Sequence, residues 1–111
     1  MLLEKSEIEA VASRLGGMFD EEFGGKRRGR YRISEKFMRH LVGRKRLYPE
    51  TIRQLQQAVF ERGFVLIDMD GFFVVIGAKT LASYRRVGPA IVGYTPDNTS
   101  AADRSDTESD E

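Results

Sequence analysis

The segment formed by residues 64–76 constrains the fold of this chain more than any other. Two runs rich in β-branched and aromatic residues, FVLIDM and FFVVI, flank the pair Asp70-Gly71. Asp-Gly suits the two-residue turn of a β-hairpin, because this turn needs a positive φ at both of its residues. With that turn, Ile67 lies opposite Val74. We therefore predict a two-stranded hairpin, which argues against an all-helical fold.

Both faces of the predicted hairpin are apolar. One face carries the pairs Met69–Phe72, Ile67–Val74 and Val65–Ile76. Asp68 is the only polar residue on the other face, which holds Phe64, Leu66, Phe73 and Val75. A hairpin standing free in solvent would alternate apolar and polar residues. We expect the protein's own helices to cover one face, and residues 80–92 or a partner subunit to cover the other.

Residues 2–23 carry the period of an amphipathic helix. Its apolar stripe, with spacings of three and four residues, consists of Ile8, Val11, Ala12, Leu15, Met18 and Phe19. Ser6 and Glu9 have the spacing of a capping box. Gly16 and Gly17 each weaken a helix by about 1 kcal/mol relative to alanine. The helix therefore either stops at these glycines or continues to Phe23.

A very short strand at residues 31–33 precedes the next predicted helix, Glu35–Val42. Ser34 is a good N-cap for it, and Gly43 can end it in a left-handed conformation. Its buried stripe should contain Phe37 and Leu41, joined by Met38 and Val42.

The following helix should span residues 49–62. Pro49 suits its first position, where a missing N–H costs nothing, and Gly63 is a clear stop. The apolar stripe of this helix is predicted to be Ile52, Leu55, Val59 and Phe60. Between the two helices lies a basic turn, Arg44-Lys45-Arg46.

The C-terminal quarter is less regular. Residues 79–87 suit either a short helix or an irregular strand, and residues 90–92 can add a last strand. From residue 95 onward the sequence is acidic and almost without large apolar residues, which is typical of disorder. We expect one domain over residues 1–94 and a disordered acidic tail over residues 95–111. The tail either solubilises the chain or competes with nucleic acid for the basic part of the domain.

Charge is distributed unevenly along the chain. Lys plus Arg against Asp plus Glu is 2 against 6 in residues 1–23, 11 against 2 in residues 24–53, 4 against 3 in residues 54–93, and 1 against 6 thereafter. The net charge of +1 therefore hides a block of +9 at residues 24–53. A concentrated positive block indicates binding to a polyanion. The alternative is that these cations only form a solvated surface.

Several function classes have little support. The chain has no cysteine, so disulfides and thiolate metal sites are excluded, and we expect a soluble, cytoplasmic protein without a signal peptide or membrane span. His40 is the single histidine, and no serine is spaced from it in a way that indicates a nucleophile–histidine pair. We expect no catalytic residue, no metal and no cofactor.

The basic block and the helix after it supply candidate contacts to duplex DNA. Outward-facing residues of the helix after Pro49 would pair with base edges, because arginine matches guanine and glutamine matches adenine. The predicted base contacts are Thr51, Arg53, Gln54 and Gln57. Cations around the turn and in the glycine-rich loop before the strand would position phosphates. The predicted phosphate contacts are Lys26, Arg27, Arg28, Arg30, Arg32, Arg44, Lys45, Arg46 and Tyr48.

Residues 31–76 resemble the winged helix-turn-helix family of small prokaryotic regulators. The matching signs are YRIS before a helix, GRKRLYPETIRQL across the turn and second helix, and GFVLIDMDGFFVVI as the wing. The resemblance implies an α+β winged fold that binds duplex DNA, usually as a homodimer, with the helix from Pro49 as the recognition helix. Asp70 departs from the pattern, because wing tips of this family often bear a cation. The implied role is a transcriptional regulator, such as a repressor, or a plasmid- or phage-type accessory factor.

Three alternatives stay open. In the phage-repressor type of helix-turn-helix, the helix Glu35–Val42 would read DNA through Lys36, Arg39 and His40. The domain could instead dock on another protein, such as a polymerase or a partition or toxin partner, as the apolar strands and acidic wing tip suggest. RNA binding is a third option, although the stacking platforms of RNA-binding modules are not evident.

Overall fold

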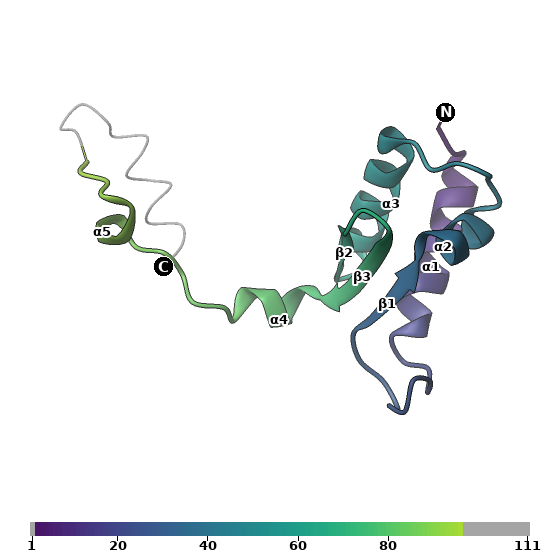
Figure 1. Ribbon diagram of the computed structural model, residues 1–111, viewed down its shortest axis with the longest axis horizontal. Helices are drawn as coiled ribbons and strands as arrows, with labels where there is room; N and C mark the ends of the chain where they lie inside the picture. The colour runs from purple at the N-terminus through teal and green to yellow at the C-terminus, as the bar shows by residue number, and fades with distance from the viewer. Residues whose placement is uncertain (1, 97–111) are drawn as a thin grey trace.

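The computed structural model describes residues 2–96 (Figure 1). It is an α+β fold in which helices pack against a small antiparallel sheet. The elements in chain order are α1 (Lys5–Met18), β1 (Tyr31–Ser34), α2 (Glu35–Val42), α3 (Pro49–Glu61), β2 (Phe64–Asp68), β3 (Phe72–Gly77), α4 (Ala78–Ala82) and α5 (Pro89–Val92). The predicted strand at residues 90–92 is wrong, because these residues belong to a single helical turn.

The predicted hairpin is confirmed. β2 and β3 are antiparallel, with Ile67 opposite Val74 as the turn requires, and β1 joins β3 to give the sheet order β1-β3-β2. Asp70 and Gly71 have φ values of 59° and 137°. A left-handed φ is uncommon outside glycine, but Asp is among the residues that tolerate it, and the Asp70 N–H is held by the Asp68 carboxylate at 3.0 Å.

The predicted caps around α2 are also confirmed. The Ser34 hydroxyl accepts a hydrogen bond from the Phe37 N–H at 3.1 Å, and Gly43 ends the helix with a φ of 75°. β1 is tied to α1 through the Tyr31 hydroxyl, which donates to the Leu15 carbonyl at 2.6 Å. Burial of this side chain raises the pKa of Tyr31 well above its usual value.

One face of the sheet and three helices enclose the core. Its most buried side chains come from α1, α2, α3 and β3, and they are Leu15, Met38, Leu55, Val59 and Val75. The predicted burial of Phe37 and Phe60 is wrong, because these rings are 61 % and 63 % exposed. In α3 the buried face instead includes Thr51 and Ala58.

The opposite face of the sheet is not covered by the C-terminal segment. Val65, Ile67 and Val74 are half-buried on it, whereas Ile76, opposite Val65, is 7 % exposed. α4 contacts β3, and the chain then runs away from the domain through α5, as Figure 1 shows. The expectation that residues 80–92 cover this face is therefore wrong for residues 83–92, and coverage by a partner subunit stays a prediction.

α1 is shorter than the longest predicted helix and begins differently. Its N-cap is Glu4, whose N–H donates to the Glu7 carboxylate at 2.9 Å, so the predicted Ser6–Glu9 capping box is wrong. The helix passes through both glycines and ends at Met18. Gly16 lies against β2, where an added Cβ would be 3.3 Å from the Phe64 ring.

Alanine at the two glycines should have different effects. Nothing lies within 4 Å of the position that a Cβ would take at Gly17. Gly17→Ala should therefore raise the free energy of unfolding by about 0.5–1 kcal/mol. Gly16→Ala should gain less or destabilise the fold, because the Phe64 ring must move. Urea unfolding of both variants measures this, and equal gains would show that Gly16 is not packed on β2.

None of the helices within residues 2–96 is long and apolar enough to cross a membrane.

Candidate nucleic-acid interface

Many cations of this protein are held in ion pairs. Arg14 pairs with Glu21, Arg28 with Asp20, Arg39 with Glu35, Arg44 with Glu7 and Arg62 with Glu9. A paired cation has part of its charge already compensated, so it attracts a phosphate less strongly than an unpaired one. The unpaired cations therefore indicate where a polyanion would bind.

Arg44 is a structural residue of the turn between α2 and α3. Its guanidinium lies 3.1 and 3.2 Å from the two carboxylate oxygens of Glu7, which joins the turn to α1. The hydrogen bond from the Glu4 N–H, helped by Arg44, lowers the pKa of Glu7. Arg44 is thus occupied within the domain, which weakens its predicted role as a phosphate contact.

Lys45, Arg46 and Tyr48 form the exposed part of this turn, and we refer to these three residues as the basic turn. They line a shallow pocket together with Arg44 and Thr51. Lys45 and Arg46 have no ion-pair partner among residues 2–96. The basic turn leads directly into the first turn of α3 at Pro49, so its two cations flank the start of that helix.

The outer face of α3 differs from the predicted one. Arg53 and Gln57 are exposed, as expected. Thr51 is only 2 % exposed and faces the core. The Gln54 amide is turned toward the N-terminal segment, where it accepts from the Leu3 N–H at 2.9 Å and donates to the Leu3 carbonyl at 3.2 Å. The predicted outward orientation of Thr51 and Gln54 is therefore wrong.

These errors share one physical reason. The predicted stripe was Ile52, Leu55, Val59 and Phe60, but the helix is rotated so that its buried face consists of Thr51, Leu55, Ala58 and Val59. A small threonine fits this buried face, while Phe60 is left outside. The hydrogen bonds from Gln54 to Leu3 span 51 residues. No local pattern in the sequence signals a contact of that range.

The glycine-rich loop of residues 24–30 is folded into a compact turn. Phe23 and Lys26 exchange backbone hydrogen bonds of 3.0 Å, and the Gly29 N–H donates to the Phe19 carbonyl. Arg28 is bound to Asp20, and the Arg32 guanidinium lies 5.8 Å from the centre of the Phe72 ring. In this loop and in β1, the exposed cations without an ion pair among residues 2–96 are Lys26, Arg27, Arg30 and Arg32.

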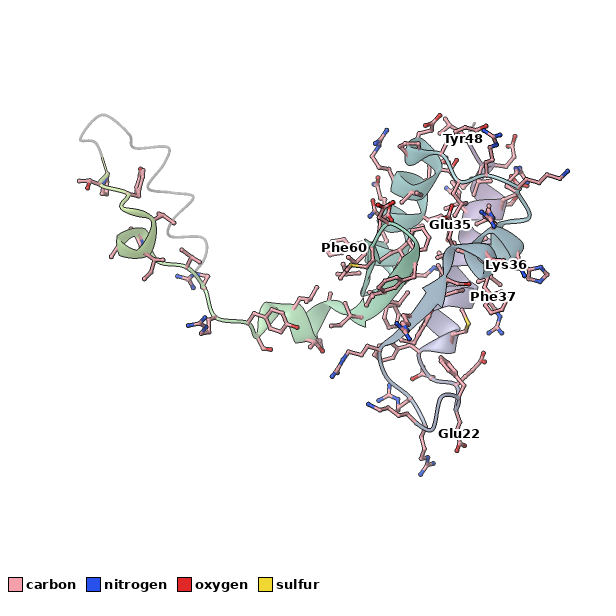
Figure 2. The ribbon with its side chains drawn as sticks, viewed as in Figure 1. Glu22, Glu35, Lys36, Phe37, Tyr48 and Phe60 are labelled. Carbon is pink, nitrogen blue, oxygen red and sulfur yellow. The ribbon has the colours of Figure 1, made fainter. Side chains whose placement is uncertain are left out.

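The loop and the basic turn are not brought together. Glu22, which begins the loop region, and Tyr48 lie at opposite ends of the domain in Figure 2. Lys36 of α2 lies between them on one flank, while Phe60 of α3 faces the other flank. The loop and the basic turn, which both belong to the +9 block of the sequence, thus lie on separate surfaces.

No protein-family model, curated protein or solved structure matches this chain.

Proposed function

We propose that this protein binds duplex DNA as a winged helix-turn-helix homodimer, with the basic turn and the exposed face of α3 against the DNA. The observation that carries the proposal is that two exposed cations at the start of α3, Lys45 and Arg46, have no ion-pair partner among residues 2–96. The order of elements supports it, because a strand, two helices and a hairpin with sheet order β1-β3-β2 match the layout that the resemblance implies.

In this proposal the basic turn positions the protein on the phosphate backbone. Side chains of lysine, arginine and tyrosine commonly hold the register of a recognition helix through phosphate oxygens. Lys45, Arg46 and Tyr48 have those chemistries and precede the helix directly. The hairpin tip supports a smaller role for the wing, because Asp68 and Asp70 are exposed carboxylates that phosphates repel.

Base recognition falls to two side chains of α3. Arg53 is exposed and can present two donors to guanine, and Gln57 lies one helical turn further along the same face. Arg53 lines a shallow groove between α3 and the wing that also contains Gln56 and Asp68. With a single arginine on the face, sequence preference should depend on few base pairs in each half-site.

Removing the Arg53 side chain should relax the sequence preference. We expect Arg53→Ala to lose about 1–3 kcal/mol of binding at one base position of each half-site. Selection from a randomised duplex library, repeated with the variant, measures the preference. Gln54→Ala is the control, because its amide is bound to Leu3 and its loss should leave the preferred sequence unchanged. A uniform loss over all sequences for Arg53→Ala would make Arg53 a phosphate contact instead.

Docking on another protein is the second candidate function. The acidic wing tip and the exposed rings of Phe23 and Phe37, which line one groove, favour it, because exposed apolar patches often mark protein contacts. The two functions differ in salt dependence. DNA binding weakens steeply with salt. If the protein showed no affinity for duplex DNA even at low salt, docking on another protein would explain the structure better.

A further inference from the structure

The C-terminal arm, residues 83–96, exposes apolar side chains that the domain does not cover. Tyr84, Val87, Ile91, Val92 and Tyr94 are between 40 % and 79 % exposed. Figure 1 shows the arm running away from the domain beyond α4. Five large apolar residues within eleven positions are far more than a solvated linker carries, and their burial against another surface would be favourable.

An apolar groove, which we refer to as the aromatic groove, lies beside β1. Two of its lining residues, Phe23 and Phe37, are 43 % and 61 % exposed. Its other lining residues are Met18, Tyr31, Arg32, Ile33, Ser34 and Phe72. β1 is an edge strand of the sheet. Edge strands with an adjacent apolar groove are surfaces on which an extended segment can bind.

The aromatic groove continues into the glycine-rich loop of residues 24–30, which we refer to as the basic loop. A second hollow shares Phe23, Tyr31 and Arg32 with the groove and is also lined by Lys26, Arg28 and Arg30, with Glu21 as its single acidic residue. The domain surface therefore changes from apolar to basic along this path. The C-terminal sequence changes in the matching way, because the apolar arm is followed by residues 97–111, which contain six acidic residues and one arginine.

We propose that the C-terminal arm of one copy docks in the aromatic groove of a second copy, and that the acidic residues after the arm then meet the basic loop of that copy. The exchange is reciprocal, so each copy both donates an arm and receives one. It gives the basic loop a partner other than DNA, at the end of the domain away from the basic turn.

The direction of the arm favours a second copy over the same chain. The Ala78 N–H donates to the Gly63 carbonyl at 3.0 Å, which fixes the start of α4 at the end of the sheet. α4 then leads the arm away from its own domain (Figure 1). With α5 helical and its ten other residues extended, the arm can span roughly 40 Å, which is enough to cross onto a neighbouring copy.

Reciprocal exchange also buries enough surface for a stable dimer. Five large apolar side chains on each arm give ten in the pair, and four of these are tyrosines. Complete burial of an aromatic side chain removes roughly 150–250 Å² from solvent, so Tyr84 and Tyr94, which are 63 % and 40 % exposed, can each bury roughly 60–160 Å². Together with the groove residues, this burial reaches the range of about 1,200–2,000 Å² that is typical of specific interfaces.

Engineered cysteines test the exchange directly, because the chain has no cysteine of its own. An Ile91→Cys chain is mixed with a Phe37→Cys chain in the absence of DNA and oxidised mildly. We expect a disulfide-linked heterodimer on a non-reducing gel. Phe60→Cys is the matched control, because Phe60 is as exposed as Phe37 but lies outside the groove, and it should cross-link much less. Equal cross-linking of both partners, or none, would overturn the proposal.

Two further measurements distinguish the exchange of arms between two copies from docking of the arm on its own domain. A chain that carries both Ile91→Cys and Phe37→Cys should form linked dimers, whereas an internal disulfide in a monomer would show that the arm folds onto its own domain. Sedimentation of Ile91→Asp/Val92→Asp should show a dissociation constant at least about tenfold above that of the unmodified protein. An unchanged constant would contradict the proposal, and neither result bears on DNA binding.

Discussion

Replacing Lys45 and Arg46 with alanine should lower the affinity for duplex DNA by at least about a hundredfold at 50 mM salt. A homodimer presents two such cations per copy, and each phosphate contact releases counterions when it forms. Four contacts correspond to a slope of about −3.6 in a plot of log affinity against log salt concentration. The double variant should therefore lose both most of its affinity and most of this slope.

The matched control is Lys26→Ala/Arg27→Ala, which removes the same charge from the loop at the opposite end of the domain. Both variants should be compared at concentrations where each is dimeric. We expect the loop variant to bind DNA with nearly the affinity of the unmodified protein. If instead the loop variant lost as much affinity as the turn variant, DNA would contact the loop and the division of the basic block would have no functional meaning.

The second large effect concerns stability and the rotation of α3. Leu55 is 1 % exposed, and Leu55→Ala should lower the free energy of unfolding by about 2–5 kcal/mol through lost burial and the cavity left behind. Phe60 is a larger side chain on the same helix but is 63 % exposed. Phe60→Ala should therefore change the stability by less than about 0.5 kcal/mol.

Urea unfolding followed by circular dichroism gives both values, and each variant serves as the control for the other. The amphipathic pattern of the sequence placed both residues in one buried stripe, so it predicts large losses for both. A loss of several kcal/mol for Phe60→Ala would mean that its ring is buried in solution and that the orientation of α3 described above is wrong.

Local signals predicted the elements of this fold well. The hairpin followed from Asp70-Gly71 between two β-rich runs, and α2 followed from Ser34 and Gly43, because turn and cap preferences depend on neighbouring residues alone. The start of α3 followed from Pro49 for the same reason. These features need no knowledge of what the segment packs against.

The site depended on long-range contacts and was predicted less well. Thr51 was assigned to the DNA face, but it is buried because α3 is rotated against α1 and the sheet. Gln54 and Arg44 looked free in the sequence, yet Leu3 and Glu7 bind them across 51 and 37 residues. Charge counting joined the loop and the turn into one block, whereas the fold places them at opposite ends of the domain.

The most direct test of DNA binding is the affinity of the unmodified protein for duplex DNA as a function of salt. We expect a mobility shift at 50 mM salt that weakens roughly a hundredfold by 200 mM, as four phosphate contacts per dimer require. Binding that does not change with salt, or no shift even at the lowest salt concentration, would contradict the account.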